Sequence, residues 1–536
     1  MAPPLTPPGG PRRLAVPVAV ASIAVVLAGV ALFAGPGGSG ARSAGSEVKV
    51  LGGEPASLDP ARHGDAGSAA MVSQLFETLT ALDPSLTLRP ALAESWVVEP
   101  GAKRVVFTLR AGLTFSDGSP LRANDVVRSW RRLVDPDHPS PLASLLADVR
   151  GADAALAGTG TAESVGISAD GDRRVVVDLA RPAADFPTIV ASPAFGIVPA
   201  SIGDGDVGDD PRTFVGSGAY VLHEHNPEGL QLSANPAYWA GRPSVATIDV
   251  TTDLGGSSAV QGFENRTVDY AAVPGFDARW IAYDDTLGPD LRQVPSLSVE
   301  YYGFDTRRPP FDNARVRRAF AEAVDWRRIA ALDETGTSTP ATGLVPDGIP
   351  GRPAGDFLPR FDPGDARRLL ADAGYADVTR LPRIDFVSSG SPHDEAVVDQ
   401  LKANLGVDVA YETMDFEAYS DRLASDPPSI WTLSWVADYP GPNDFLGVLL
   451  RTGSTANYGG YRSAAFDAAI DRARAASDEA ATEAGYAAAM QIVRDDVPVV
   501  PVTYGTGWAL ARSGLLGAQE NGNGILRFAG LEWAAP

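Results

Sequence analysis

The amino-acid sequence predicts an α/β protein divided into two or three lobes. Strand-like and helix-like patterns alternate along both halves of the chain, which is typical of α/β architecture. A chain of 536 residues is also too long to enclose a single hydrophobic core. Because 44% of the residues are apolar, the chain can fill several cores and does not have the composition of a disordered protein.

Charge and cysteine content exclude several classes of function. The chain carries 44 Lys and Arg residues against 67 Asp and Glu residues, a net charge of -23, which argues against nucleic acid or an anionic membrane surface as partner. There is no cysteine, so disulfides, thiolate nucleophiles, cysteine-bound zinc and a lipid-modified cysteine anchor are all excluded.

The first 46 residues are expected to lie outside the fold as a tail, an apolar segment and a Gly/Ser linker. Arg12 and Arg13 precede residues 14–34, which carry no charge and are about long enough to span a bilayer. Positive charge before such a segment keeps the N-terminus inside and exports the rest of the chain. The working domain is therefore expected outside the cytoplasm, either released by cleavage or anchored by residues 14–34.

The first half of the folded part is predicted to begin with a strand and to continue mainly with strands. The strands are short runs rich in β-branched residues and bounded by turn residues, whereas Met71, Leu75 and Leu79 recur at helical spacing. Asn124 is expected to cap its helix. Strands are predicted at 48–52, 95–98, 104–109, 173–179, 220–222, 230–233, 246–250 and 267–273, and helices at 68–79, 124–133 and 259–265.

A second unit is predicted to begin near Leu297. Val316, Phe320 and Val324 share one helix face, and Gly374 and Gly406 end two further helices. Strands are predicted at 298–304, 383–387, 407–411, 430–436, 499–504 and 508–511, and helices at 313–324, 365–373, 394–405 and 464–493.

One stretch, residues 431–445, stands out for its chemistry. A buried apolar strand leads to Asp438, and the prolines and glycine at 440–442 cannot continue that strand. A carboxylate flanked by Trp435 and Tyr439 suits binding of a ligand's positive charge, because aromatic rings exclude water and strengthen the ion pair. The alternative is that Asp438 simply begins a surface turn.

The motifs of catalysis and of metal binding are absent or incomplete. G-x-S-x-G and H-E-x-x-H do not occur, and His223 and His225 lie beside a hairpin tip without further ligands nearby. Gly203, Gly205 and Gly208 match the dinucleotide fingerprint by letter, but the aspartates between them would repel phosphate. We therefore predict no catalytic residues, no cofactor and no metal site, with an extracellular hydrolase as the alternative from another class.

A series of short stretches in order resembles the solute-binding proteins of ABC importers, family 5, the peptide- and nickel-binding group. Each stretch is unspecific by itself, and their order and spacing over about residues 48–515 carry the resemblance. The stretches are 54–60 (EPASLDP), 92–96 (LAESW), 107–121 (FTLRAGLTFSDGSPL), 216–220 (GSGAY), 235–239 (NPAYW), 302–306 (YGFDT), 310–312 (PFD), 316–320 (VRRAF), 366–375 (ARRLLADAGY) and 435–440 (WVADYP).

The resemblance implies a two-lobed periplasmic-binding-protein-like fold of type II. It places the first lobe at 47–296 with an extra subdomain at about 75–188, the second lobe at 297–496, and a return to the first lobe at 497–536. Crossing strands would join the lobes, which close on the ligand by a hinge motion before docking on a membrane permease.

The implied function is an extracytoplasmic receptor, expected to be a monomer and not an enzyme, that captures oligopeptides for an ABC permease. In peptide-binding members the aspartate at the position of Asp438 binds the α-ammonium group, while the peptide backbone pairs with strands of both lobes. Binders of other solutes, such as oligosaccharides or metal chelates, are the alternative. The implied ligand-binding residues are Asp438, Trp435, Ser434, Val436, Glu54 and Ala56, with Tyr302 at the cleft wall.

The sequence departs from this pattern at Thr432. Some peptide binders carry an arginine at that position, six residues before the aspartate, which neutralises the carboxylate of the peptide. Arg422, Arg451 and Arg462 are the candidates to replace it, and the sequence does not choose among them.

Overall fold

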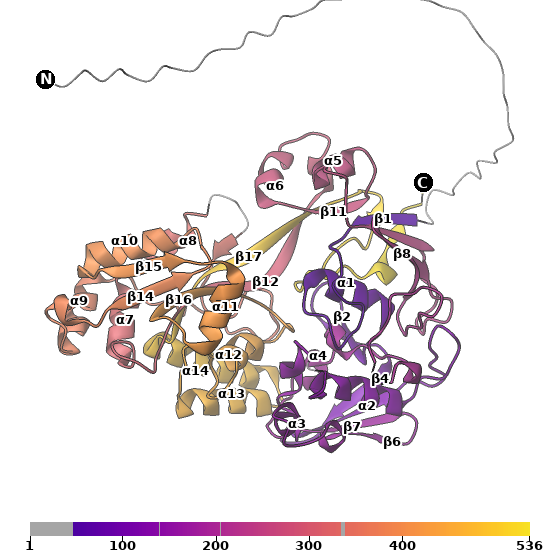
Figure 1. Cartoon of the computed structure of the whole chain (residues 1–536), viewed down its shortest axis with the longest axis horizontal. Helices are drawn as coiled ribbons and strands as arrows, with labels where there is room; N and C mark the ends of the chain where they lie inside the picture. Colours follow the sequence, from indigo (N-terminus) through magenta and orange to yellow (C-terminus); the bar gives the residue numbers. More distant parts are fainter. Residues whose placement is uncertain (1–46, 139, 204, 334–337, 536) are drawn as a thin grey trace, which may run out of the picture. The chain divides into compact units, whose positions relative to one another are not determined.

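A large mixed sheet organises the computed structural model, which describes residues 47–138, 140–203, 205–333 and 338–535 (Figure 1). All of these residues belong to one unit of the chain, and the apolar segment at 14–34 with its linker lies outside them. The sheet has eleven strands in the order β15-β14-β16-β12-β17-β11-β1-β10-β9-β8, with β13 added to β17. Within the described residues no helix is long and apolar enough to cross a membrane.

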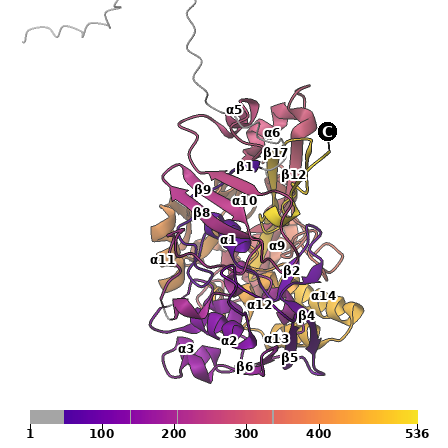
Figure 2. The same cartoon turned by 90° about the vertical axis from the view of Figure 1, so that its right-hand side faces the viewer.

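We call the part of the sheet from β11 to β8, with the segments packed on it, the first lobe. The strand at the N-terminal end, β1, is parallel to both of its neighbours, and β8 and β9 form a hairpin that lies beside α1 (Figure 2). Its elements are β1 (Glu47–Leu51), α1 (Ala66–Leu75), β8 (Tyr220–Asn226), β9 (Gly229–Ala234), β10 (Thr247–Thr251), α5 (Ala259–Glu264), β11 (Tyr270–Val273) and α6 (Gly275–Ile281).

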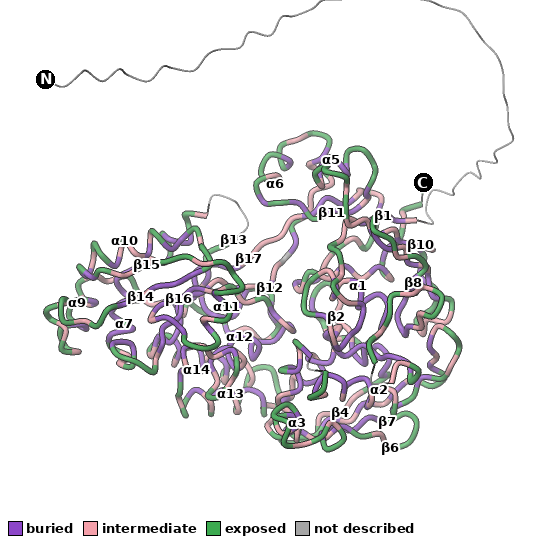
Figure 3. Tube along the Cα trace, viewed as in Figure 1, coloured by how far each residue is buried: buried purple, intermediate pink, exposed green. Residues whose placement is uncertain are grey.

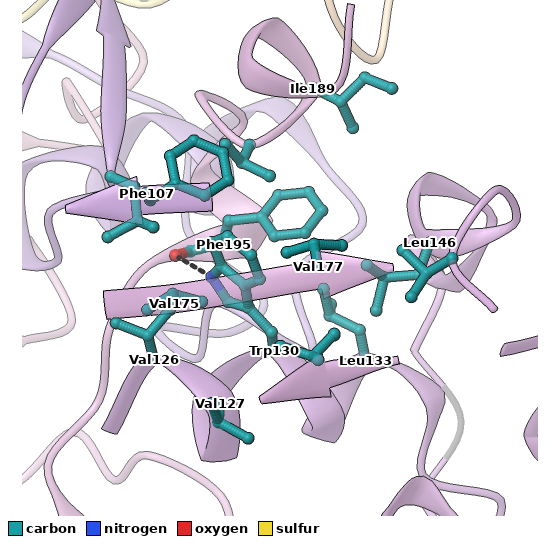
Figure 4. Close-up of a cluster of buried hydrophobic side chains, with 14 of the residues drawn as sticks. Phe107, Val126, Val127, Trp130, Leu133, Leu146, Val175, Val177, Ile189 and Phe195 are labelled. Carbon is teal, nitrogen blue, oxygen red and sulfur yellow. Dashed lines mark hydrogen bonds between the residues drawn. The ribbon is translucent and has the colours of Figure 1, made fainter. Parts of the chain in front are cut away.

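A subdomain of the first lobe has its own antiparallel sheet, in the order β4-β5-β7-β6. Its core is built around Trp130, whose indole nitrogen donates to the carbonyl oxygen of Phe195 at 3.2 Å (Figure 4). Helix α2 begins after Arg122, not at the predicted cap Asn124, because Asp125 accepts the backbone N–H of Arg122 at 2.9 Å. The elements are β2 (Thr80–Leu82), β3 (Leu88–Pro90), β4 (Ala93–Val98), β5 (Arg104–Leu109), α2 (Ala123–Arg131), α3 (Ala152–Leu156), β6 (Ile167–Asp170), β7 (Arg174–Asp178) and α4 (Phe186–Ile189).

The second lobe encloses the other end of the large sheet between two cores. Adjacent residues of one strand, Tyr301 and Tyr302, enter different cores, as the two-residue period of a strand requires. Strand β14 is buried between them (Figure 3). The elements are α7 (Ala314–Glu322), α8 (Trp326–Ala330), β13 (Ser338–Pro340), α9 (Pro363–Asp372), β14 (Ile384–Ser388), α10 (Asp394–Leu405), β15 (Val409–Thr413), α11 (Phe416–Ser425), β16 (Ile430–Val436), α12 (Pro442–Leu450), α13 (Ala464–Ala475) and α14 (Glu479–Asp496).

Two long strands, β12 (Leu291–Phe304) and β17 (Val499–Ala511), run through both lobes. Where they pass from one lobe to the other their pairing is irregular: Pro295 pairs with Thr506, but the next pair is Val299 with Tyr504. The extra residues of β12 crowd Gly505, at which a Cβ would lie 2.2 Å from the Ser298 hydroxyl. The sequence prediction missed the first half of β12 and divided β17 in two, because polar residues and glycines interrupt the apolar pattern at this crossing.

Candidate functional site

Asp438 lies two residues beyond the end of β16, in the short connection to α12. Its backbone N–H donates to the Asp444 carboxyl at 3.1 Å, and the indole N–H of Trp435 donates to the same oxygen at 3.0 Å. Asp444 belongs to the first turn of α12 and is fully buried. The start of α12 therefore holds both the strand end and the backbone of Asp438 in place.

Burial makes both carboxyl groups hard to ionise. It raises the pKa of Asp438 to about 6. It also raises the pKa of Asp444 well above its usual range, and the neighbouring charge of Asp438 adds to this effect. No Lys, Arg or His among the described residues forms an ion pair with the Asp438 carboxylate. An ionised carboxylate in such surroundings favours a cationic ligand group.

Asp438 faces a pocket that both lobes line. The pocket encloses about 490 Å³ of space free of atoms, open solvent included. Tyr439 and Pro440 line it together with Asp438 on the side of the second lobe. On the side of the first lobe the polar lining is provided by Ser73, Thr78, Ser192, Asn521, Asn523 and Arg527.

The segment 521–527 belongs to the C-terminal return and holds the Asp438 connection from the other side. The side-chain amide nitrogen of Asn523 donates to the Ala437 carbonyl oxygen at 2.8 Å. Asn521 in turn accepts the backbone N–H groups of Asn523 and Ile525, both at 3.1 Å, which shapes the loop. Sequence reasoning missed Asn523 and Arg527, because no local pattern in the return relates them to Asp438.

The pairing of β16 with β14 ends at Trp431. Beyond Trp431, within the part of the chain that the structure describes, β16 has a strand neighbour on one side only, which is β12. Ala437 donates its backbone N–H to the Leu297 carbonyl oxygen of β12 at 2.8 Å. In an antiparallel pair, successive residues turn their backbone N–H and C=O groups to alternate edges of the strand. The backbone groups of Thr432, Ser434 and Val436 therefore face the edge away from β12. The Tyr419 hydroxyl bonds both backbone groups of Thr432. The side chains of Ser434 and Val436 are exposed.

The resemblance also implies two ligand-binding residues in the first lobe, Glu54 and Ala56. Glu54 and Ala56 follow β1, are exposed and do not line the Asp438 pocket. The Glu54 carboxylate lies 3.8 Å from the ring of His225. Tyr302, expected at the cleft wall, is instead buried in a core of the second lobe, where its hydroxyl donates to Asp394 at 2.7 Å.

Three arginines are candidates to replace the arginine that is missing at position 432, and none of them lines the Asp438 pocket. Arg422 pairs with Asp385 and Asp426, and Arg451 pairs with Asp471 at 2.8 Å. Arg462 is exposed. A further arginine, Arg527, lines the Asp438 pocket and is bound to the buried Glu77 through contacts of 3.0 and 3.1 Å.

Comparisons with known proteins agree with this architecture. A family model described as bacterial extracellular solute-binding proteins, family 5, middle part, matches residues 87–457. The chain is 32% identical to the "Probable deoxycholate-binding periplasmic protein YgiS" of Escherichia coli K12, covering 84% of this chain and 86% of that protein. It is 29% identical to the periplasmic oligopeptide-binding protein OppA of the same strain, covering 91% and 92% of the two chains.

One solved structure is similar over nearly the whole chain. It is described as "MppA Periplasmic Murein Tripeptide Binding Protein, Unliganded Open Form", and it superimposes with a TM-score of 0.77 at 27% identity. The match covers 91% of this chain and 97% of that one. The likeness therefore includes both lobes and the subdomain of the first lobe.

Proposed function

We propose that this chain, which belongs to the bacterial extracellular solute-binding proteins of family 5, captures peptides by their free amino terminus and delivers them to an ABC permease. The observation that carries the proposal is Asp438, a largely buried carboxylate without a cationic partner among the described residues, at a pocket lined by both lobes. A peptide's α-ammonium group supplies the missing charge.

The edge of β16 supports an extended peptide as the ligand. The backbone groups of Ser434 and Val436 face the edge of β16 away from β12, in line with Asp438 at the strand's end. An extended peptide adds to such an edge by main-chain hydrogen bonds, which do not depend on its side chains. In this proposal Asp438 selects the peptide's amino terminus, and β16 binds its backbone.

The two-lobed architecture suits a carrier that closes around its ligand. The irregular pairing of β12 and β17 between the lobes is where a hinge motion would concentrate, because few ladder bonds must change there. The chain is proposed to act as a monomer outside the cytoplasm, with residues 14–34 directing its export and either being removed or remaining as an anchor.

Calorimetric titration of the full-length chain with alanine peptides of two to five residues tests the proposal. We expect micromolar or tighter binding, weakened about 30-fold or more by N-acetylation of the peptide or by Asp438→Asn, since truncating one partner of a buried charge pair costs about 2–5 kcal/mol. Asp421→Asn, on an exposed part of α11, is the matched control and should leave the affinity unchanged. Affinity that is indifferent to both N-acetylation and Asp438→Asn would refute the role of the ammonium group.

A second candidate ligand class is a bile salt, favoured by the 32% identity to a protein named as deoxycholate-binding. Deoxycholate is an anion, so an ionised Asp438 would repel it rather than hold it. Titration with deoxycholate separates the two candidates. Tight binding of deoxycholate that strengthens in Asp438→Asn, without peptide binding, would replace the peptide proposal.

A further inference from the structure

Asn523 lines the Asp438 pocket and carries a side-chain oxygen without a hydrogen-bond partner among the described residues. Its side-chain nitrogen donates to the Ala437 carbonyl oxygen at 2.8 Å, and this bond fixes which end of the amide is the oxygen. The amide oxygen is buried and has no hydrogen-bond partner in the structure. Buried polar atoms are normally bonded, so an unpaired acceptor beside a pocket calls for a donor.

The chemistry of an ammonium group matches this arrangement. A primary ammonium group carries three N–H donors, and a single carboxylate does not use all of them. Asn523 and Asp438 line the same pocket, and Asn523 is bonded to the residue directly before Asp438. The two acceptors therefore lie at one end of β16, and one of them carries the charge.

The two acceptors come from different lobes. Asp438 follows β16 of the second lobe, whereas Asn523 belongs to the return that is fixed to the first lobe, where the Trp533 indole donates to the Glu47 carbonyl oxygen at 2.9 Å. A ligand group that bonds to both acceptors joins the two lobes at the pocket.

We infer that Asn523 is a second ligand of the peptide's α-ammonium group, accepting one of its N–H bonds while Asp438 neutralises its charge. This inference rests on the proposed function and adds to it a residue that makes recognition depend on the number of N–H donors as well as on charge. It predicts that the receptor discriminates among amino termini that are all cationic.

The test uses the alanine peptide that the full-length wild type binds most tightly, with its amino terminus free, N-methylated or N,N-dimethylated. All three forms keep the positive charge but offer three, two and one N–H donors. We expect the wild type to bind the dimethylated form about 10- to 100-fold more weakly than the free amine, as expected for one lost hydrogen bond to a charged group. In Asn523→Ala the free amine should lose a similar factor, and the penalty for dimethylation should fall to about threefold or less.

Asn523→Asp is the second variant, because it keeps an acceptor at this position while losing the donor to Ala437. It should retain the preference for the free amine. If Asn523→Ala weakens all three peptides by the same factor, or none of them, Asn523 only shapes the loop and the inference is wrong. Failure of every alanine peptide to bind, or indifference to N-acetylation, would instead refute the proposed function, which separates the two outcomes.

Discussion

Asp438 and Asp444 meet at the end of β16, and their surroundings oppose ionisation of both. Asp444 accepts hydrogen bonds from Trp435 and from the backbone of Asp438, a role that a neutral carboxyl group can fill. Asp438 keeps its carboxylate at the pocket, where burial raises its pKa to about 6. At neutral pH the ligand-free protein therefore holds a poorly solvated charge, which a cationic ligand would stabilise.

This charge should lower the stability of the free protein at neutral pH. The folded-state pKa of Asp438, about 6, lies above its ordinary value of 3.8, so between these pH values the folded state binds more protons than the unfolded state. Stability from this group is present at low pH and is lost as pH rises through about 6. Asp438→Asn should therefore raise the free energy of unfolding by about 1–3 kcal/mol near neutral pH, and the gain should vanish near pH 4.

Urea denaturation of the ligand-free full-length chain at the two pH values measures this difference. Asp421→Asn again serves as the exposed control, and surface substitutions of this kind stay within about 0.5 kcal/mol. A variant at Asp438 that is less stable than the wild type at neutral pH would show that the carboxylate has a stabilising partner.

At the scale of elements, β16 combines two functions along its seven residues. Its first part, Ile430 and Trp431, pairs with β14 on one side and with β12 on the other, which embeds it in the sheet. Beyond Trp431 one edge has no strand neighbour among the described residues, and the Tyr419 hydroxyl satisfies the backbone of Thr432. The buried part positions the strand, and the uncovered part is where a peptide could pair.

The substitution Ser434→Pro tests the uncovered edge of β16 without changing the part of the strand that is embedded in the sheet. Because the backbone N–H of Ser434 faces the uncovered edge, Ser434→Pro removes a donor to the peptide without removing a bond to β12. We expect affinity for the alanine peptide to fall about tenfold, the value of roughly one hydrogen bond. Titration calorimetry gives the affinity, and thermal unfolding confirms the fold.

Ser434→Ala is the matched control, since it removes the hydroxyl but keeps the backbone donor. It should bind the peptide like the wild type. Equal affinities of Ser434→Pro and Ser434→Ala would show that the peptide does not pair with this edge.

At the scale of the whole unit, a buried ion cluster joins the second lobe to the subdomain of the first. Arg474 of α13 is 3% exposed and bonds to Asp185 at 2.7 Å and to Asp148. Burial alone would raise the pKa of Asp148, but Arg474 and Arg181 hold it below its ordinary value. The Tyr439 hydroxyl, next to Asp438 in sequence, donates to Asp185 at 3.3 Å. The cluster thus links the packing of the lobes to the connection that carries Asp438.

Arg474→Met should destabilise the protein by about 3 kcal/mol, because it removes the shared cation of two partly buried carboxylates. Arg181 still pairs with Asp148 in this variant. Arg472→Met, on the exposed face of the same helix, should change stability by no more than about 0.5 kcal/mol. Chemical denaturation of the two variants checks this. Equal stabilities would mean that water replaces Arg474 at no cost.

The sequence by itself determined the fold class and the family, and it singled out Asp438 as the candidate for the principal site residue. Predicted bounds for the helix at 394–405 and the strand at 430–436 agree with α10 and β16, because their apolar periodicity and end signals are local. Helix 464–493, in contrast, is two helices, since Asp478 caps a new one by accepting the backbone N–H of Ala481 at 2.9 Å. Helix α12 was not predicted at all.

Only the tertiary structure decided what surrounds Asp438 and how the lobes meet. Asn523 bonds to Ala437 across 86 residues of sequence, and Arg474 bonds to Asp185 across 289. The full length of the crossing strands β12 and β17 was not predicted, because serines and glycines break their pattern where they leave one lobe for the other. Local patterns report which face of an element is buried, whereas partners so far apart in sequence are chosen by the packing of the whole unit.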